Sequence, residues 1–279
     1  MTSTQVPPLF ADLVDDAGLF PPEELPMRAA LERHQVDINR ANGVLSGRFL
    51  CPAGSIGELL GQLGAEDQLD LALVTPLEED TLRDALESLA ADGRVRLAGI
   101  EGPPASSDLS VLELVPADVP CSVEVPATGD WRAALSMLGG TAYRAKVRCG
   151  GARAELFPTA DQLGAFVTEC AARDLPFKAT AGLHHALGHV DPATSFRHHG
   201  FLNLLLSACR AVEGAPEEHV VAALCSTDAA ALVAEAQAVR EDHAKAARRL
   251  FVSYGSCSTS EPVEDLASLG LIAPARGRP

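Results

Sequence analysis

The sequence predicts an α/β protein built as a TIM (β/α)8-like barrel that is irregular in its second half. Short apolar runs alternate with amphipathic stretches from about residue 46 onward, which is typical of βαβ units around a parallel sheet. Six such units between residues 46 and 182 are too regular for a mixed α+β fold. No GxGxxG follows the first strand, which weakens the competing open sheet that binds dinucleotides.

Six strands are expected in the first part of the barrel, each an apolar run bounded by turn residues. Several are followed by leucines at helical spacing, and Asp130 and Thr159 are the expected N-caps of two of these helices. The six expected strands cover residues 47–53, 69–76, 95–103, 120–127, 142–151 and 176–182.

The second half shows less regular alternation. Residues 200–214 are predicted to form a buried helix, with a strand at FLNLLL as the alternative, and helices follow up to residue 250. A last strand is expected at 250–258, before the helix EPVEDLASLG, and no seventh strand can be located before it. The expected organisation is an N-terminal segment with a helix packed on the barrel (1–45), the barrel domain (46–272) and a frayed tail (273–279).

Composition excludes several classes of function. The chain has 279 residues and a net charge of −16, so its surface repels nucleic acids and anionic membranes. No apolar run reaches membrane-spanning length, and the N-terminus has no secretory pattern. The seven cysteines occur singly and favour buried thiols in a reducing compartment. A cytoplasmic protein is expected, and a homo-oligomer is left open.

Strand parity predicts a polar barrel interior. Alternate residues of a barrel strand point inward, and catalytic groups gather at the C-terminal ends of the strands. Buried charges must be paired with each other or with a ligand, so the set indicates either a structural ion-pair network or a substrate site. The polar residues expected to face inward are Glu101, Ser122, Glu124, Arg144, Lys146, Arg148, Lys178 and Thr180.

Lys178 is the leading candidate for chemistry. A desolvated lysine near other cations loses proton affinity and can attack a carbonyl to form a Schiff base. Glu124 is then the expected proton shuttle, and Lys146 and Arg148 are expected to bind a carboxylate or phosphate of the substrate. An equally weighted alternative is that Lys178 only binds an anion.

Histidines concentrate after the expected sixth strand. Histidine is the common acid/base group near neutral pH and a frequent metal ligand, so a divalent metal is left open while no other cofactor is expected. His184 shares the parity of Lys178, and His185 points the other way. The cluster comprises His184, His185, His189, His198 and His199, and surface or capping roles are the alternative reading.

Two small-residue stretches end strands at the expected mouth of the barrel. Gly150 and Gly151 allow backbone amides to approach an anion, with a tight turn as the alternative. Gly255 and Ser256 precede a helix N-terminus and could form a similar cradle, with serine capping as the alternative. Cys149 and Cys257, also at strand ends, are weaker candidates for a nucleophile.

The motifs KVRCGG, FKATAGLHH, HGFLN and YGSCS followed by EP resemble those of a mostly uncharacterised bacterial protein family. The resemblance covers roughly residues 142–270 and implies positions rather than a reaction. Lys178 on the expected sixth strand is also similar in placement to the lysine of barrel aldolases. The positions implied by the family resemblance are Lys146, Arg148, Gly150, Gly151, Lys178, Thr180, His184, His185, Asn203, Gly255 and Ser256.

Together these observations predict a small-molecule enzyme of lyase or aldolase type that acts on an anionic carbonyl or carboxylate compound. Lys178, His184, His185 and Glu124 are the expected catalytic residues. The alternatives are a metal-dependent hydrolase or lyase that uses the 184–199 histidines, and a non-catalytic barrel that serves as scaffold or ligand sensor. The expected substrate-binding residues are Lys146, Arg148, Gly150, Gly151, Thr180, Glu101, Asn203, Gly255 and Ser256.

Overall fold

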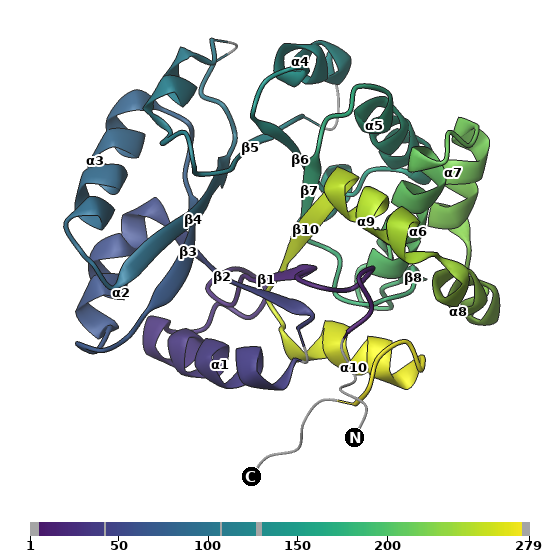
Figure 1. The fold of residues 1–279 in the computed structure, drawn as a ribbon, viewed down its shortest axis with the longest axis horizontal. Coiled ribbons are helices and arrows are strands. Elements are labelled where there is room, and N and C mark those ends of the chain that lie inside the picture. Colours follow the sequence, from purple (N-terminus) through teal and green to yellow (C-terminus); the bar gives the residue numbers. More distant parts are fainter. Residues whose placement is uncertain (1–5, 42, 107, 127–129, 275–279) are drawn as a thin grey trace.

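Eight parallel strands close into a barrel with helices on its outside (Figure 1). The structure is a computed structural model that describes residues 6–41, 43–106, 108–126 and 130–274. Around the barrel the strand order is β1-β10-β7-β6-β5-β4-β3-β2, which confirms the predicted fold class. The strands are β1 (Val14–Asp16), β2 (Leu45–Pro52), β3 (Leu69–Val74), β4 (Val95–Gly102), β5 (Cys121–Glu124), β6 (Arg144–Arg148), β7 (Phe177–Thr180) and β10 (Phe251–Ser256).

The strand that the sequence pattern does not reveal is β1, at the start of the chain. It pairs with both β10 and β2 and closes the barrel. The barrel therefore begins within the segment expected to pack on it from outside, and not at residue 46. As a consequence Lys178 lies on the seventh barrel strand, whereas Lys146 lies on the sixth.

The helices mostly follow the predicted pattern. FLNLLL is the start of α6, so its interpretation as a strand is wrong, and β7 is joined to β10 by four helices. The predicted frayed tail lies mostly outside the described residues. The helices are α1 (Met27–Arg40), α2 (Ile56–Gln62), α3 (Glu79–Ala90), α4 (Trp131–Leu138), α5 (Ala160–Ala172), α6 (Phe201–Val212), α7 (Glu217–Cys225), α8 (Ala229–Ala238), α9 (Glu241–Leu250) and α10 (Ser260–Ser268).

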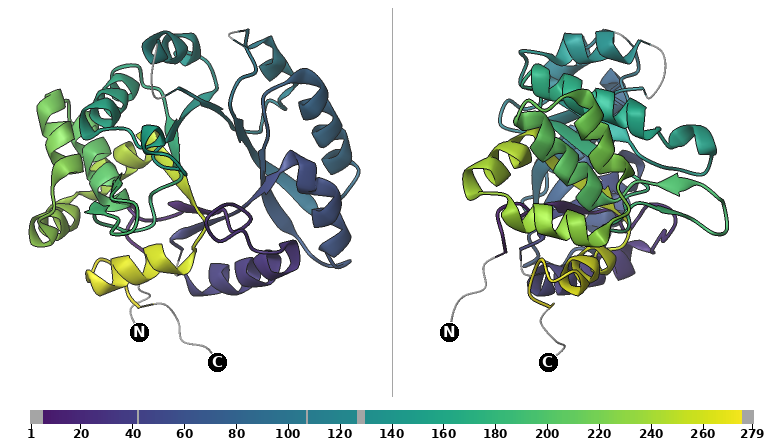
Figure 2. Two further views of the ribbon diagram at one scale, coloured as in Figure 1. Left: turned by 180° about the vertical axis from the view of Figure 1, so that it is seen from behind. Right: turned by 90° about the vertical axis from the view of Figure 1, so that its right-hand side faces the viewer.

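A small antiparallel hairpin departs from regular barrel topology. It consists of β8 (His189–Val190) and β9 (Arg197–His198) and follows β7. The hairpin projects from the end of the barrel at which the strands finish (Figure 2, right). The hairpin thus accounts for part of the second-half irregularity.

The hydrophobic core lies between the barrel and its helices. Phe177, Ala179 and Val147, the outward-facing alternates of β7 and β6, are buried in it. Nearly every residue of α6 is buried, which explains its unbroken apolar run. The inward alternates are left polar, as the strand parity predicts.

The N-terminal strand is held in place by a partly buried arginine near the end of α9. Arg248 donates to the carbonyl oxygens of Ala11 and Asp12, at 3.2 Å each, and to that of Val252 in β10 at 2.7 Å. These bonds tie the chain entering β1 to its neighbour β10.

Within the described part of the chain, no helix is long and apolar enough to cross a membrane.

Replacing Thr159 by Ala should destabilise the protein by about 1 kcal/mol, because α5 loses its capping box. The Thr159 hydroxyl accepts from the Gln162 backbone N–H, and the Gln162 side chain accepts from the Thr159 N–H. Urea unfolding measures the change. Thr159→Ser keeps the hydroxyl and should stay close to the wild type; equal losses in both variants would contradict a capping role.

Candidate active site

A ladder of alternating charges crosses the barrel interior. Its members come from six strands and are, in order, Arg48, Asp15, Lys178, Glu101, Lys146, Glu124 and Arg148. Each charge has an opposite charge on either side or lies at an end of the ladder. This arrangement satisfies the requirement that buried charges be paired.

Lys178 is held tightly at the centre of the ladder. Its Nζ lies 2.6 Å from Asp15 Oδ2 and 2.5 Å from Glu101 Oε2, and all three side chains are buried. Burial alone would lower the lysine pKa, but the two carboxylates outweigh it and raise the pKa. The expectation of a lysine with weakened proton affinity is therefore wrong, because its neighbours are carboxylates and not cations.

Asp15 is the carboxylate that faces Lys178 from β1. Besides the lysine it accepts hydrogen bonds from Ser46, Arg48 and Ser253. Burial would raise its pKa, yet Lys178 and Arg48 hold the pKa well below the usual range. Asp15 is thus an anion anchored at the N-terminal side of the ladder.

Lys146 is held more loosely than Lys178. Its Nζ lies 3.3 Å from Glu124 Oε2 and 3.6 Å from Glu101 Oε1, both longer than a direct hydrogen bond. Glu124 Oε1 in turn accepts from Arg148 Nε at 3.2 Å. Glu101 Oε1 is buried and has no hydrogen-bond partner among the described residues. The C-terminal half of the ladder therefore has unused bonding capacity.

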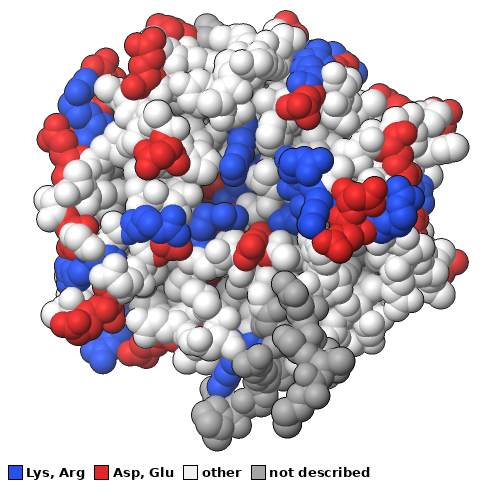
Figure 3. Space-filling view, viewed as in Figure 1, with Lys and Arg blue, Asp and Glu red and all other residues white. Residues whose placement is uncertain are grey.

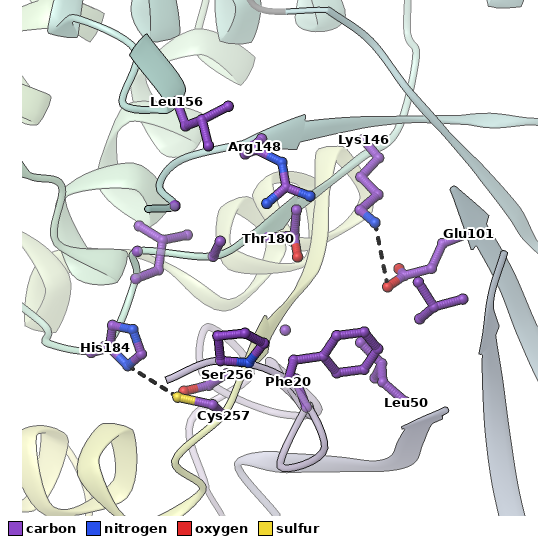
Figure 4. A pocket seen from close by; sticks show the side chains of 18 of the residues that line it. Phe20, Leu50, Glu101, Lys146, Arg148, Leu156, Thr180, His184, Ser256 and Cys257 are labelled. Carbon is purple, nitrogen blue, oxygen red and sulfur yellow. Dashed lines mark hydrogen bonds and ion pairs between the residues drawn. The ribbon is translucent and has the colours of Figure 1, made fainter. Parts of the chain in front are cut away.

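A pocket of about 270 Å³ opens at the C-terminal end of the barrel (Figure 4). Glu101, Lys146, Arg148 and Thr180 line its polar side. The backbone and small side chains of Gly151, Gly255 and Ser256 also line it, and the remaining wall is mostly apolar, including Phe20, Leu50, Val74, Leu156 and Leu183. The predicted positions from β4, β6, β7 and β10 therefore meet in one cavity.

A histidine and a cysteine meet at the rim of this pocket. Cys257 Sγ lies 3.6 Å from His184 Nδ1, and Glu261 Oε2 lies 3.7 Å from the same nitrogen. Burial lowers the pKa of His184 and raises that of the Cys257 thiol to about 11. Both groups are therefore neutral near pH 7, and His184 can accept a proton there.

Five predicted site residues do not line the pocket. Lys178 lies deeper in the ladder, and Glu124 contacts the pocket only through Lys146 and Arg148. His185 is half exposed beside Asp265. Gly150 packs against the next loop, since a Cβ there would lie 2.7 Å from the Gly182 Cα. Asn203 is fully buried on α6.

Asn203 has a structural role instead of the expected substrate contact. Its Nδ2 donates to the carbonyl oxygens of Ala223 and Ser226, and its Oδ1 accepts from the Gly188 N–H. These bonds use both amide hydrogens, so no donor remains for a substrate. The residue joins the loop after β7 to α7.

The other histidines pack on one another in the hairpin region. His189 stacks on His198 with ring centroids 5.0 Å apart, and His199 Nε2 bonds to the Pro158 carbonyl oxygen. No group of three His, Cys, Asp or Glu side chains among the described residues is arranged to hold a metal ion. The geometry therefore gives no support to a metal centre.

Sequence reasoning missed the ladder residues of the first two strands. Asp15 lies in β1, a strand of only three residues. Arg48 has the parity of an inward residue of β2 but stands near its start, away from the mouth. The pairing of His184 with Cys257 joins two loops that are distant in sequence and carries no local signal.

Lys178→Met should destabilise the protein by about 3–5 kcal/mol at pH 7, because Asp15 and Glu101 lose their shared cation while buried. The loss should shrink as pH falls below about 5, when the variant's carboxylates become neutral. The stability of the wild-type protein has the opposite pH dependence, because it falls when these carboxylates become protonated. The contribution of Asp15 is present above its ordinary pKa of 3.8 and is lost as pH falls through the depressed value, and that of Lys178 is lost only above 10.5.

Urea unfolding of Lys178→Met at pH 7, 5 and 4 checks this. Lys245→Met is the matched control, since Lys245 pairs with Glu241 on the exposed face of α9 and should change little. A loss for Lys178→Met that is independent of pH would contradict the charge argument.

Iodoacetamide should modify Cys225 well before Cys257 at pH 7.5. Cys225 is exposed, whereas Cys257 is buried with its pKa raised to about 11, and only the thiolate reacts. Mass spectrometry of labelled peptides gives the order, and the Cys257 rate should rise steeply up to about pH 11. Fast labelling of Cys257 at pH 7.5 would show that His184 stabilises its thiolate.

The seven cysteines are free thiols, and all but Cys225 are buried, as predicted.

No protein-family model matches the chain, and no curated protein matches its sequence. The motif resemblance to a bacterial family therefore stays a prediction. A solved structure of dihydropteroate synthase from Xanthomonas albilineans with 4-aminobenzoic acid is similar at 14% sequence identity and a TM-score of 0.42, over 94% of this chain and 92% of that one. This likeness is too distant to carry an argument about function.

Proposed function

We propose that the C-terminal pocket is the active site of a lyase of the aldolase type, which acts on a small anionic carbonyl compound. The observation that carries the proposal is Glu101 Oε1, a buried carboxylate oxygen on the pocket wall that has an ion pair with Lys146 at 3.6 Å but no hydrogen-bond partner among the described residues. Leaving such an atom unsatisfied is costly, so a ligand that donates a hydrogen bond to it supplies the missing partner.

An anion is the kind of substrate that the pocket's cations favour. Arg148 lines the pocket with its side chain 37% exposed, and among the described residues only its Nε is engaged, by Glu124. Its remaining N–H groups can bind a carboxylate in the bidentate manner. The apolar wall opposite would exclude water from the rest of the ligand.

Lys146 is the nucleophile that the proposal assigns, in place of Lys178. It lines the pocket, it stands on the sixth strand, and its ion pairs of 3.3 and 3.6 Å are looser than those of Lys178. Glu124 would take a proton from the ammonium group, and the free amine would add to the substrate carbonyl with loss of water. The bond between the α and β carbons of this iminium then breaks: its electron pair forms an enamine, and the β-hydroxyl proton passes to Glu124 as the second carbonyl product forms.

Glu101 and His184 would complete the chemistry. Burial raises the pKa of Glu101, but Lys146 and Lys178 outweigh it and lower the pKa, so Glu101 stays ionised and accepts a hydrogen bond from the substrate. His184, neutral at the rim, is placed to exchange a proton with product or solvent. Phe20 and Leu183 belong to the wall around the carbon chain.

Borohydride trapping with pyruvate and other small 2-oxo acids should attach a reduced adduct to Lys146. Peptide mass spectrometry locates it. Lys146→Met should abolish the adduct, whereas the exposed Lys245→Met should leave it unchanged. Adduct formation at Lys178 alone would contradict this assignment of the nucleophile. Ligand-induced stabilisation without adduct or turnover would instead identify a non-catalytic sensor.

Arg148→Met should raise the KM for an anionic substrate roughly 10- to 100-fold, because hydrogen bonds to a charged group are worth about 1.5–3 kcal/mol. Arg148→Lys, which keeps the charge but not the bidentate geometry, should give a smaller rise. Steady-state kinetics on any substrate found by the trapping screen measures both. An unchanged KM in Arg148→Met would show that the anion binds elsewhere.

A further inference from the structure

The N-terminal end of the barrel contains a second, much smaller cavity. Its volume is about 20 Å³, which is room for roughly one particle the size of a water molecule. It lies below the ladder, on the opposite side of Lys178 from the C-terminal pocket, and the proposed reaction does not use it. The polar side chains that line it are Asp15, Arg48, Glu101, Ser122, Arg144, Lys178 and Ser253.

Two donors in this cavity lack partners. Ser122 on β5 and Arg144 on β6 are paired in register, so their side chains stand side by side on the inner face of the barrel. Within the described part of the chain, neither the Ser122 hydroxyl nor the Arg144 guanidinium has a hydrogen bond or an ion pair. This differs from Arg48, Lys146, Lys178 and Arg148, each of which has a carboxylate partner.

The carboxylates in the lining are already engaged. Asp15 binds Arg48 and Lys178, and Glu101 binds Lys178. Three cations (Arg48, Arg144 and Lys178) therefore face two carboxylates, which leaves one positive charge without a counter-charge. Burial, and then the repulsion from Arg48, lower the pKa of Arg144 by more than the attraction from Asp15 raises it. Arg144 is thus partly desolvated beside a like charge.

The surface at the N-terminal end of the barrel also carries an excess of positive charge around its centre. Figure 3 views the end of the barrel at which the strands begin and shows Lys and Arg side chains gathered around a hollow near its centre. The chain as a whole has a net charge of −16, so a positive opening runs against the general charge of the protein.

We infer that this cavity binds a small inorganic anion of about chloride size, held between Arg144 and Arg48 with the Ser122 hydroxyl as a further donor. The anion supplies the missing counter-charge and the missing acceptor for both unpartnered donors. The anion would lie at the N-terminal end of the barrel, the end that typically serves stability. Its expected effect is therefore on stability and not on the proposed reaction at the C-terminal pocket.

Crystals soaked in sodium bromide test the site directly. Anomalous diffraction should show a bromide peak between Arg48 and Arg144, and the peak should be absent in Arg144→Met. An empty cavity, or a bromide peak that persists without Arg144, would overturn the inference. A phosphate soak that displaces the bromide would show that the site also admits a larger oxyanion at its opening.

Thermal unfolding in solution gives an independent test. Replacing sodium gluconate by sodium chloride at constant ionic strength should raise the wild-type Tm by roughly 2–4 °C. This shift is expected when the chloride concentration is about ten times the dissociation constant. Arg144→Met should not respond to chloride, and in gluconate it should be at least as stable as the wild type, because it no longer faces Arg48. Arg83→Met, on the exposed face of α3, is the control.

An equal chloride response in wild type and Arg144→Met would reduce the effect to general screening and overturn the inference. Arg144→Lys guards against a variant that fails to fold, since it keeps the charge and should retain a weakened response. A response retained in full by Arg144→Met and lost in Arg83→Met would likewise overturn it.

Discussion

The ion pairing of Lys178 with Asp15 and Glu101 is the interaction on which the barrel interior depends. Barrel interiors are usually filled by Val, Ile and Leu, whereas this one carries a ladder of buried charges. Each member is tolerated only because its neighbours neutralise it, and removal of one leaves others uncompensated. Asp15 comes from the first strand and Lys178 from the seventh, so the pair also links two barrel strands that are far apart in the sequence.

The ion pairs of the ladder become longer and more exposed from its centre toward the C-terminal end of the barrel. The contacts of Lys178 are 2.5 and 2.6 Å, those of Lys146 are 3.3 and 3.6 Å, and the Arg148 side chain is partly exposed. Short pairs at the centre fix the strands, and long pairs at the C-terminal mouth leave donors and acceptors free for a ligand. On the proposed function, one network would therefore serve stability at its centre and ligand recognition at its C-terminal end.

The sequence predicted the polar interior well, because strand parity depends only on the alternation of side chains. Glu101, Lys146 and Lys178 are buried and paired as that parity requires. The sequence-based predictions failed where a strand was too short to show a pattern or where the contacts of a residue were distant in the sequence. β1 has three residues, too few for a periodic pattern, and missing it shifted the count of every later strand. Asn203 stood out through its motif, yet its partners lie in another helix and a loop.

The ladder also limits which of its carboxylates can carry a proton during a reaction. Protonation of Glu101 would leave Lys178 with Asp15 alone and Lys146 with Glu124 alone, so the cost falls on two lysines at once. Glu124 is less buried and contacts Lys146 and Arg148, both at the pocket, where a bound anion can compensate for its lost charge. In the proposed reaction, proton transfer to Glu124 therefore costs less once the anionic substrate is bound, which would couple the chemistry to the arrival of the anion.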